Sequence, residues 1–458
     1  MCAVIVPIID RQKNLSEKIE NTFLFKIRET SQEMARGILA NPKLENITEV
    51  IRDQLLKLGS EVASATLNNI ALEEQHNNAS KTKGNRGRTL NTILGPVSYE
   101  RKAFYDAENS SLSFPADDAL GIHAGQIQSD VLKRVIKLGM EVPFKEASEL
   151  CESLMGVAVS EGSIHGAVVK AGQQAEYKDV VPTKEEIHEK LDKLKNSNPN
   201  EKAHIVIGVD GAMEPLRPEN SLRKGKRGEC FWKECKGFRV YATVGEKTIE
   251  HLISWHQIGN DEDLGKHLAY AAESLEGRSE QIVVVADGAK WIWNQISKTF
   301  KSHIEIIDWY HVVEHLSNYA DTQFGKDKEK KQVWLEEAKL RLMNNDVGRI
   351  IHGLVRMSHR NSCAKETSEK LRNYLKSNKE RMKYGAFKKQ NLTIGSGGME
   401  SANKSVAHIR LKRNGCWWKS PHANEMLRLR CAKTNGTLDR FLSKCWKKGL
   451  RLITNDVE

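Results

Sequence analysis

The sequence has no long hydrophobic run. None of its apolar stretches approaches the ~20 residues that a helix needs to cross a bilayer, so we expect neither a membrane span nor a membrane partner. The N-terminal segment MCAVIVPIIDRQKN is apolar only briefly, no basic residue precedes it, and Asp10 interrupts it, which does not fit a secretory signal or an anchor. The eight cysteines are scattered through 458 residues without a framework, a pattern typical of reduced thiols in a cytoplasmic protein.

Zinc and nucleotide motifs are also missing. GSGGMES (395–401) could hold a phosphate at a helix start, but no GKS or GKT follows it, so it is not a Walker motif. Cys230 and Cys235 form one C-x4-C spacing without a second pair, which favours buried or edge-strand thiols over a zinc site. His311 and His315 have the i, i+4 spacing of a helix and Asp308 lies one turn before His311, but a fourth zinc ligand is absent. The sequence therefore favours neither nucleotide hydrolysis nor zinc binding.

Positive charge is concentrated near the C-terminus. The formal net charge is +11, and residues 401–458 hold thirteen lysines and arginines against four acidic residues, an excess of nine. Such a concentration favours a polyanionic partner, nucleic acid before a membrane surface, although a solvated basic tail has the same composition. Trp417 and Trp418 lie among these basic residues, where they could stack on unpaired bases or pack in the core. The candidate DNA contacts are Arg410, Lys412, Arg413, Trp417, Trp418 and Lys419.

The first 182 residues carry helical patterns and one hairpin pattern. Residues 1–80 show the apolar spacing of helices, residues 76–88 are polar like a linker, and TILGPVSYERKAFY (92–105) alternates like a hairpin. Three short helices are predicted next, and the turn before Ser160, the expected N-cap of the third, suits a helix-turn-helix. A purely structural three-helix bundle gives the same pattern. We expect a helix-turn-helix-like, DNA-binding region over residues 86–182.

The sequence pattern changes from helical to strand-like after the polar segment 183–202, and this segment predicts a domain boundary. Three strands (HIVIGVDG, FRVYATVG and TIEHLISWHQI) precede an alternation of helices and strands, so the predicted order is β-β-β-α-β-α-β-α. This order indicates an α/β fold with a mixed sheet and helices on its faces. Residues 321–390 are rich in Lys and Glu and lack any strand pattern, which indicates an all-helical insertion. The core then comprises residues 203–320 and 391–435, and a basic tail follows over 436–458.

Three acidic residues occupy comparable places in this pattern. Asp210 ends the first strand of the mixed sheet and Asp287 ends the fourth, so the two carboxylates lie side by side if these strands are neighbours. Glu400 lies near the start of the helix that follows GSGG, and that helix could bring it against them. An Asp after a strand can also simply cap the next helix. Three clustered carboxylates repel one another, and two Mg²⁺ ions about 3.5–4 Å apart, or Mn²⁺ in their place, would neutralise them.

The motifs VVADGAKWIW, DWYH and GSGGMES, in this order and spacing, resemble those of bacterial insertion-sequence transposases with an Asp-Asp-Glu triad. The resemblance is to the Kra-type group, relatives of the Mutator-like enzymes; it is strong over 203–320 and 391–435 and looser over 86–175. It implies a ribonuclease H-like core that follows mostly helical DNA-binding regions and carries the helical insertion between the second Asp and the Glu. One departure is that AFYDAENSSLSF lacks the cysteine pairs that relatives often carry after the LGPV-like strand.

The resemblance also assigns residues to the chemistry. Asp210, Asp287 and Glu400 match the catalytic triad, whose carboxylates bind two Mg²⁺ ions. Asp308 and His311 match a D-x-x-H motif in which the His assists near the scissile phosphate. The resemblance therefore implies that His311 acts with the triad.

Two other glutamates compete with Glu400 for the third place. Glu214 lies in AMEPL, where the following proline and the exit of the chain from the strand predict an outward-facing side chain. Glu314 shares a helix face with two histidines, and Asp308 would crowd that face. In the insertion, Trp334 could hold a flipped base, as the resemblance suggests, or anchor the helical bundle.

The function that follows is that of a DNA transposase. It would bind the terminal inverted repeats of its insertion sequence, cleave there by metal-dependent phosphodiester hydrolysis, and join the 3′-OH ends to target DNA. The expected partners are double-stranded DNA, at transposon ends and target, and further copies of the chain in a homo-oligomer of at least two. Two alternatives remain open: an inactive or repurposed transposase-derived DNA-binding protein, and another ribonuclease H-like nuclease.

Overall fold

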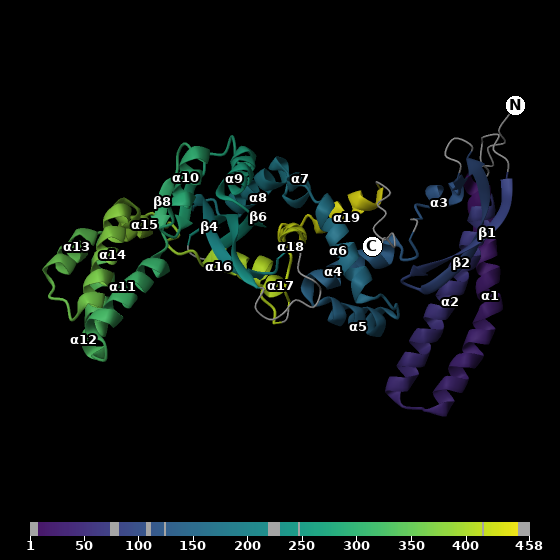
Figure 1. Cartoon of the computed structure of the whole chain (residues 1–458). Helices are drawn as coiled ribbons and strands as arrows, with labels where there is room; N and C mark the ends of the chain where they lie inside the picture. The colour runs from purple at the N-terminus through teal and green to yellow at the C-terminus, as the bar shows by residue number, and fades with distance from the viewer. Residues whose placement is uncertain are drawn as a thin grey trace. The chain divides into compact units, whose positions relative to one another are not determined.

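The computed structural model describes the chain in seven stretches that fall into two compact units (Figure 1). The first unit comprises residues 1–171 and 442–458, and the second comprises residues 172–441. Among the helices described, none is both long enough and apolar enough to pass through a membrane. The described residues are 8–73, 82–106, 111–122, 125–218, 230–245, 248–414 and 416–447.

The first unit begins with two long helices and an antiparallel sheet of order β1-β2-β3, namely α1 (Ile8–Ala40), α2 (Leu44–Glu73), β1 (Thr82–Thr92), β2 (Gly95–Asp106) and β3 (Ser111–Ser113). Helix α2 packs along β2, where Ser64 Oγ accepts the Ser98 N–H and Asn68 Oδ1 accepts the Glu100 N–H. These contacts satisfy backbone groups on the side of β2 away from β1. The predicted helices and hairpin are confirmed. The linker prediction is wrong for residues 82–88, which extend β1, while residues 76–81 lie outside the described stretches.

Three helices follow in the first unit, α4 (Ser129–Glu141), α5 (Phe144–Met155) and α6 (Glu161–Gln174), after the short α3 (Pro115–Ala119). Gly156 ends α5 with a left-handed φ of 67°, which glycine adopts without strain. The Ser160 hydroxyl accepts the Ser163 N–H at the start of α6, so the predicted helices and cap are confirmed. DNA binding by these helices stays a prediction. Their apolar faces bury Val131, Val135, Ala147, Cys151, Val157, Val159 and Ile164.

The second unit is built on a five-stranded mixed sheet of order β6-β5-β4-β7-β8. The strands are β4 (Ala203–Leu216), β5 (Phe231–Val244), β6 (Thr248–Ile258), β7 (Gln281–Ala286) and β8 (Ile304–Ile307). The first three are antiparallel to one another, whereas β7 runs parallel to β4 and β8 runs parallel to β7. The protein is therefore an α/β protein with a mixed sheet, as predicted. The contact between the first and fourth strands of the predicted order is confirmed as well.

The helices that pack on this sheet include one that the sequence did not predict. Helix α8 contacts β5 and β6 and buries Ile187, Leu191 and Leu194, which recur at helical spacing. The boundary predicted over 183–202 is therefore wrong, because this polar segment has an apolar face that packs on the sheet. Helices α8 (Lys184–Ser197), α9 (Asp261–Ser274) and α18 (Ser420–Thr434) contact the sheet. Helix α7 (Tyr177–Val180) packs against α18, and α10 (Lys290–Thr299) packs against α9.

The outer edge of β6 is covered by side-chain amides. Asn424 Oδ1 accepts the Ile258 N–H and Asn424 Nδ2 donates to the Ile258 carbonyl. Asn435 makes the same pair of hydrogen bonds with Ser254. Because both amides fill the backbone donors and acceptors of an edge strand, this edge is closed to pairing with another strand at these positions.

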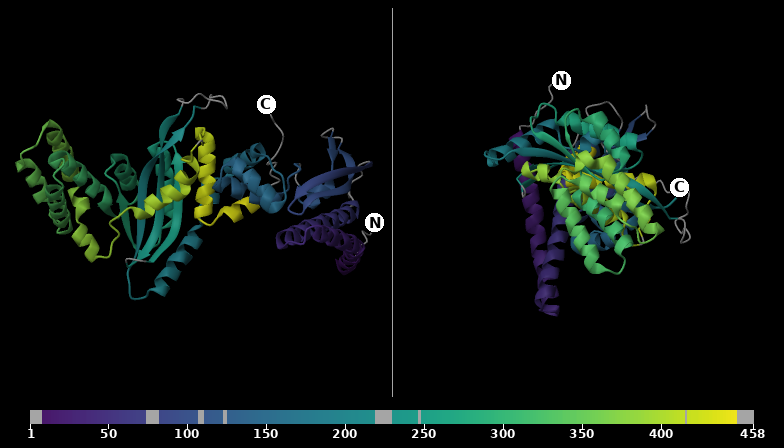
Figure 2. Two further views of the ribbon diagram at one scale, coloured as in Figure 1. Left: turned by 90° about the horizontal axis from the view of Figure 1, so that it is seen from below. Right: turned by 90° about the vertical axis from the view of Figure 1, so that its left-hand side faces the viewer.

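The insertion is a bundle of helices, which Figure 2 shows in green beside the teal strands of the same unit. It comprises α11 (Trp309–Phe324), α12 (Lys328–Met343), α13 (Val347–Arg356), α14 (Ser362–Asn378), the 3₁₀ helix η1 (Lys379–Met382) and α15 (Tyr384–Lys389). The all-helical prediction for 321–390 is confirmed. Trp334 is half-buried, with its ring centroid 5.1 Å from that of Tyr319, so it packs between α11 and α12, and a contact with a flipped base stays a prediction.

The last described element corrects the prediction of a basic tail over 436–458. Residues 438–447 form α19 (Leu438–Lys447), and residues 448–458 lie outside the described stretches. An apolar stripe was present in the sequence of α19 at i, i+3, i+4 and i+7, although its lysines dominate the composition. The side chains that α19 buries are Leu438, Phe441, Leu442 and Cys445.

Candidate metal centre

Asp210 and Asp287 lie at the same edge of the sheet. In the parallel pair of β4 and β7, Val209 is the partner of Ala286, so the pairing ends immediately before the two aspartates. Asp287 follows β7 as predicted, whereas β4 continues past Asp210 to Leu216, so the prediction that Asp210 ends its strand is wrong. Burial raises the pKa of Asp210 to about 6, and the nearby charge of Asp287 acts in the same direction. A bound cation would therefore favour the ionised form of Asp210, and hard oxygen ligands of this kind suit Mg²⁺ or Mn²⁺.

A chain of hydrogen bonds fixes the side chain of Asp210. Gly237 on β5 lies between Asp210 on β4 and His256 on β6, and a Cβ at Gly237 would overlap the His256 ring. The imidazole therefore reaches across the glycine, with Nε2 3.0 Å from Asn403 Oδ1, while Asn403 Nδ2 donates to Asp210 Oδ2 at 2.8 Å. Burial lowers the pKa of His256 to about 4, so the ring is neutral and its Nε2–H donates to Asn403. No sequence motif had marked Gly237, His256 or Asn403 as site residues.

Asn403 belongs to a helical run that follows the glycine-rich turn, formed by α16 (Gly397–Ala402), the π-helix η2 (Asn403–His408) and α17 (Ile409–Leu411). Met399 packs against Gly208, Asn403 bonds Asp210, and His408 Nε2 lies 3.3 Å from Glu214 Oε1. The spacing of five residues between Asn403 and His408 is that of a π turn, which keeps both side chains on β4. The glycine-rich turn that opens a basic helix is thus confirmed.

Glu400 does not join the two aspartates in this structure. Its side chain is 65% exposed and accepts a hydrogen bond from Lys404 Nζ at 2.7 Å, which lowers the pKa of Glu400. The part of the chain that the structure describes contains no group of three His, Cys, Asp or Glu side chains placed to hold a metal. Glu400 and Asn403 are three residues apart on one helix, however, and such neighbours have Cβ atoms about 5–6 Å apart. The Glu400 backbone therefore lies one helical turn from the residue that touches Asp210.

The two residues of the D-x-x-H motif lie in different environments: Asp308 makes structural hydrogen bonds, whereas His311 lies near the carboxylate pair. Asp308 caps α11 by accepting the N–H groups of Tyr310 and His311, and it also accepts the N–H and the hydroxyl of Ser396 at 2.9 Å each. It therefore fastens the segment before α16 to the start of α11. His311 lies close enough to Asp210 for its charge to lower the pKa of that carboxyl, and its Nε2 is 3.2 Å from His315 Nε2.

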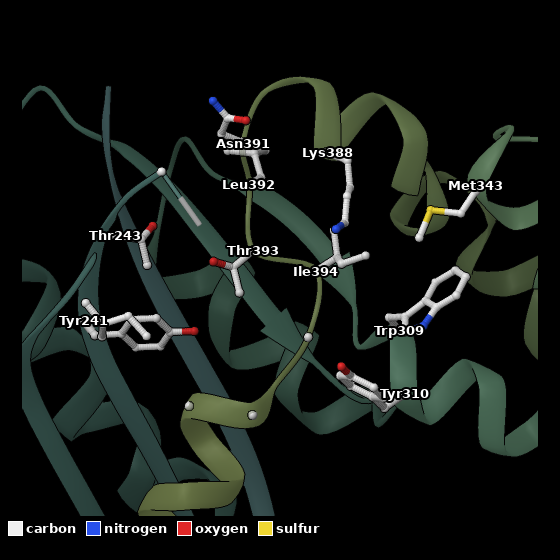
Figure 3. Close-up of a pocket in the computed structure, with 15 residues that line it drawn as sticks. Tyr241, Thr243, Trp309, Tyr310, Met343, Lys388, Asn391, Leu392, Thr393 and Ile394 are labelled. Carbon is white, nitrogen blue, oxygen red and sulfur yellow. The ribbon is translucent and has the colours of Figure 1, made fainter. Parts of the chain in front are cut away.

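The glycine-rich segment borders a pocket of about 560 Å³ (Figure 3). Gly398 approaches the Tyr241 ring so closely that a Cβ there would lie 3.0 Å from it, a close backbone approach that glycine allows. Arg239 Nη1 donates to the Gly398 carbonyl at 2.8 Å. Because the N–H and hydroxyl of Ser396 both bond Asp308, those two donors are not available to a phosphate.

The structure corrects the prediction for Glu214. This side chain is 0% exposed rather than outward-facing, and burial raises its pKa to about 7. Neither carboxylate oxygen has a hydrogen bond among the described residues, although His408 is near. The strand continues through Pro215, so Glu214 shares the face of Asp210 beneath the helical run. Glu314 is 68% exposed and lies 3.9 Å from His311 Nδ1.

Two of the six candidate DNA contacts are buried within the second unit. Arg410 is 1% exposed and Trp418 is 6% exposed, with the guanidinium 5.1 Å from the centre of the indole. Their assignment as DNA contacts is therefore wrong, because both side chains are used in packing. Lys412 is exposed, whereas Arg413, Trp417 and Lys419 are half-buried, and DNA binding by these four stays a prediction.

The fold and the carboxylate pair define an α/β protein with an acidic site where the pairing of two parallel strands ends. Residues 40–192 match the model of an uncharacterised protein family, UPF0236. A UPF0236 protein of Caldanaerobacter subterraneus subsp. tengcongensis is 25% identical over 409 residues, which cover 85% of this chain and 78% of the relative. A second one from that organism is 24% identical over 409 residues, or 85% and 79% of the two chains.

A relative from Streptococcus gallolyticus is similar over much of the chain as well. It is 24% identical over 366 residues, which cover 77% of this chain and 74% of the relative, and its name places it in the vanSb 3′ region. These similarities extend well beyond residues 40–192, so they include a large part of the second unit.

Proposed function

We propose that this protein is a DNA transposase with a ribonuclease H-like core, which cuts the ends of its own element and joins them to target DNA. The observation that carries the proposal is the pair Asp210 and Asp287, placed where the parallel pairing of β4 and β7 ends, with Glu400 one helical turn from Asn403, which bonds Asp210. Three antiparallel strands followed by two parallel strands, with a helical insertion before the Glu, support the ribonuclease H-like assignment.

The residues present fit a divalent metal. Asp210 and Asp287 would hold it, and Glu400 would join them by leaving Lys404 and turning toward Asn403. Among the described residues, the bond to Lys404 is the one that the exposed Glu400 side chain would give up. When bound, a pair of Mg²⁺ or Mn²⁺ ions stabilises both the attacking and the leaving oxygen of a phosphodiester displacement. The same residues would serve cleavage and joining, since water and a 3′-OH are similar nucleophiles.

Other residues of the chain keep this site in order. Asn403 and His256 hold Asp210 in one orientation, and Asp308 fixes the start of the helical run that carries Glu400. His311, near the carboxylates, would exchange a proton at the scissile phosphate. The exposed Lys412 and its basic neighbours would bind the DNA backbone, and the helices of the first unit would read the terminal repeats.

The names of the relatives add a separate line of support. The name of the first Caldanaerobacter relative joins eleven locus designations, and that of another joins four. A protein encoded at many places in one genome is the trace that a self-copying DNA element leaves. This favours a transposase over a nuclease of general metabolism.

The test is cleavage of a labelled duplex that carries the inverted repeats flanking this gene, in Mg²⁺ and in EDTA. Asp210→Asn, Asp287→Asn and Glu400→Ala should abolish cleavage and joining while leaving end binding within a few-fold. Glu314→Ala is the matched control, because this exposed glutamate lies outside the carboxylate pair and should leave cleavage measurable. No Mg²⁺-dependent cleavage by the unaltered protein would reject the proposed activity, and a fully active Glu400→Ala protein would reject the third ligand.

A non-catalytic DNA-binding protein is the second candidate, and the exposed position of Glu400 favours it. Binding of the flanking repeats without any metal-dependent nicking would establish this alternative. Nicking without joining of pre-cut ends would instead indicate another nuclease on the same fold.

A further inference from the structure

Tyr374, on α14 of the insertion, has a hydroxyl group that is shielded from solvent and has no hydrogen-bond partner among the described residues. A buried donor without an acceptor is unfavourable, and such groups are rare in folded proteins. Burial raises the pKa of Tyr374, and the charges of Asp287 and Asp308 act in the same direction. The phenol is therefore protonated at neutral pH and is available as a donor.

The ring of Tyr374 is held against the candidate metal centre. A Cβ on Gly288, the residue after Asp287, would overlap the Tyr374 ring, so the ring occupies the space that this glycine leaves. The ring also lies against His315, with centroids 4.3 Å apart, and His311 is at 6.4 Å. The side chain of Tyr374 thus extends from the insertion to the backbone next to Asp287.

Asp308 and Asp287, whose charges act on Tyr374, differ in how many hydrogen bonds their oxygens accept. Asp308 accepts hydrogen bonds from Tyr310, His311 and Ser396, which occupy both of its oxygens. Asp287 accepts a single hydrogen bond among the described residues, from the Ala289 N–H to Oδ1 at 2.8 Å. Of these two carboxylates, Asp287 is therefore the one with an oxygen, Oδ2, that accepts no hydrogen bond among the described residues.

We propose that Tyr374 is a positioning residue for Asp287, whose Oδ2 accepts the Tyr374 hydroxyl in the metal-loaded site. Tyr374 then orients Asp287 as Asn403 orients Asp210. Each carboxylate of the pair accepts a hydrogen bond from one neutral donor. The insertion becomes a part of the metal centre rather than an appendage to it. This inference rests on the proposed function, because it assumes that Asp287 binds metal.

The test is Mn²⁺ binding by the full chain, followed by electron paramagnetic resonance of the free ion, with Tyr374→Phe as the variant. Loss of a group behind a metal ligand typically weakens metal binding ~10–100-fold, and we expect Tyr374→Phe to do so. Phenylalanine keeps the ring contacts and removes an unpartnered hydroxyl, so the metal-free variant should unfold at the same temperature or a higher one. A merely structural role would lower the unfolding temperature and leave Mn²⁺ affinity unchanged.

Tyr319→Phe is the matched control. It removes another hydroxyl of the helical bundle, which lies 3.1 Å from Met357 Sδ, and it should leave Mn²⁺ affinity unchanged. Tyr374→Phe protein that binds Mn²⁺ as tightly as the unaltered chain overturns the role of Tyr374 alone. Mn²⁺ binding that is the same in the unaltered chain and in an Asp210→Asn, Asp287→Asn double variant overturns the metal centre, and the role of Tyr374 with it.

Discussion

Replacing Glu214 by glutamine should make the protein's stability less dependent on pH. The Glu214 carboxyl is fully buried, lacks hydrogen bonds among the described residues, and has a pKa that burial raises to about 7. His408, 3.3 Å away, does not neutralise it at neutral pH, because burial lowers the pKa of His408. Glutamine has nearly the same shape and never ionises.

The expected magnitude follows from the pKa. Its ordinary value of 4.5 applies to the unfolded chain, and about 7 applies to the folded one. At about 1.4 kcal/mol per pKa unit, ionised Glu214 destabilises the fold by about 3 kcal/mol. Below pH 4.5 the carboxyl is neutral in both states and contributes nothing. Between pH 4.5 and about 7 the unfolded chain ionises first, so stability falls as pH rises, and above that range the full loss is present.

The assay is urea unfolding of the unaltered chain and Glu214→Gln at about pH 5 and about pH 8. A buried, unpartnered amide costs about 1–3 kcal/mol of its own, but that cost is independent of pH. The difference in free energy of unfolding between the two proteins should therefore move in favour of Glu214→Gln, by about 2–3 kcal/mol, across this range. Glu314→Gln, at an exposed site, should follow the unaltered chain. Parallel pH dependences of Glu214→Gln and the unaltered chain would refute the reasoning.

Three further outcomes are expected. Asn403→Leu removes the donor to Asp210 and should weaken Mn²⁺ binding ~10–100-fold, as measured on the full chain. DNA cleavage at limiting Mg²⁺ should fall as pH drops through about 6, because Asp210, whose pKa burial raises to about 6, is then protonated; a flat profile across that pH would contradict this. The double substitution Lys412→Ala and Arg413→Ala should lower the slope of log affinity for duplex DNA against log salt by ~0.9 for each DNA phosphate that these side chains neutralise, and an unchanged slope would show that they lie away from DNA.

The architecture of the second unit could be predicted because its signals are local. Val- and Ile-rich runs that end in Asp210 and Asp287 mark buried strands, and their order along the chain restricts how they pair. The all-helical insertion and the glycine-rich turn before Glu400 were visible for the same reason. The segment 183–202 was wrongly predicted to be a domain boundary because its polar composition concealed the helical spacing of its few apolar residues. The segment 438–447 was wrongly predicted to be a basic tail for the same reason.

The parts of the site that could not be predicted depend on distant segments. His256 and Asn403 are 147 residues apart in the sequence. They meet above Asp210 because Gly237, on the strand between those of Asp210 and His256, leaves room for the imidazole. The outward orientation predicted for Glu214 failed because Pro215 does not end β4. Beyond Val209, β7 no longer pairs with β4, so Pro215 has no β7 partner that would need its N–H, and β4 tolerates a proline there.

The measurement that tests the central claim most directly is strand joining. Duplexes that carry the flanking inverted repeats with pre-cut 3′-OH ends are incubated with supercoiled plasmid, the full chain and Mg²⁺, and covalent products are counted. We expect joined products with the unaltered chain and none in EDTA, with Asp210→Asn or with Asp287→Asn. Absence of joining by the unaltered chain, or equal joining by the two aspartate variants, would contradict the assignment of this site as the centre of a transposase.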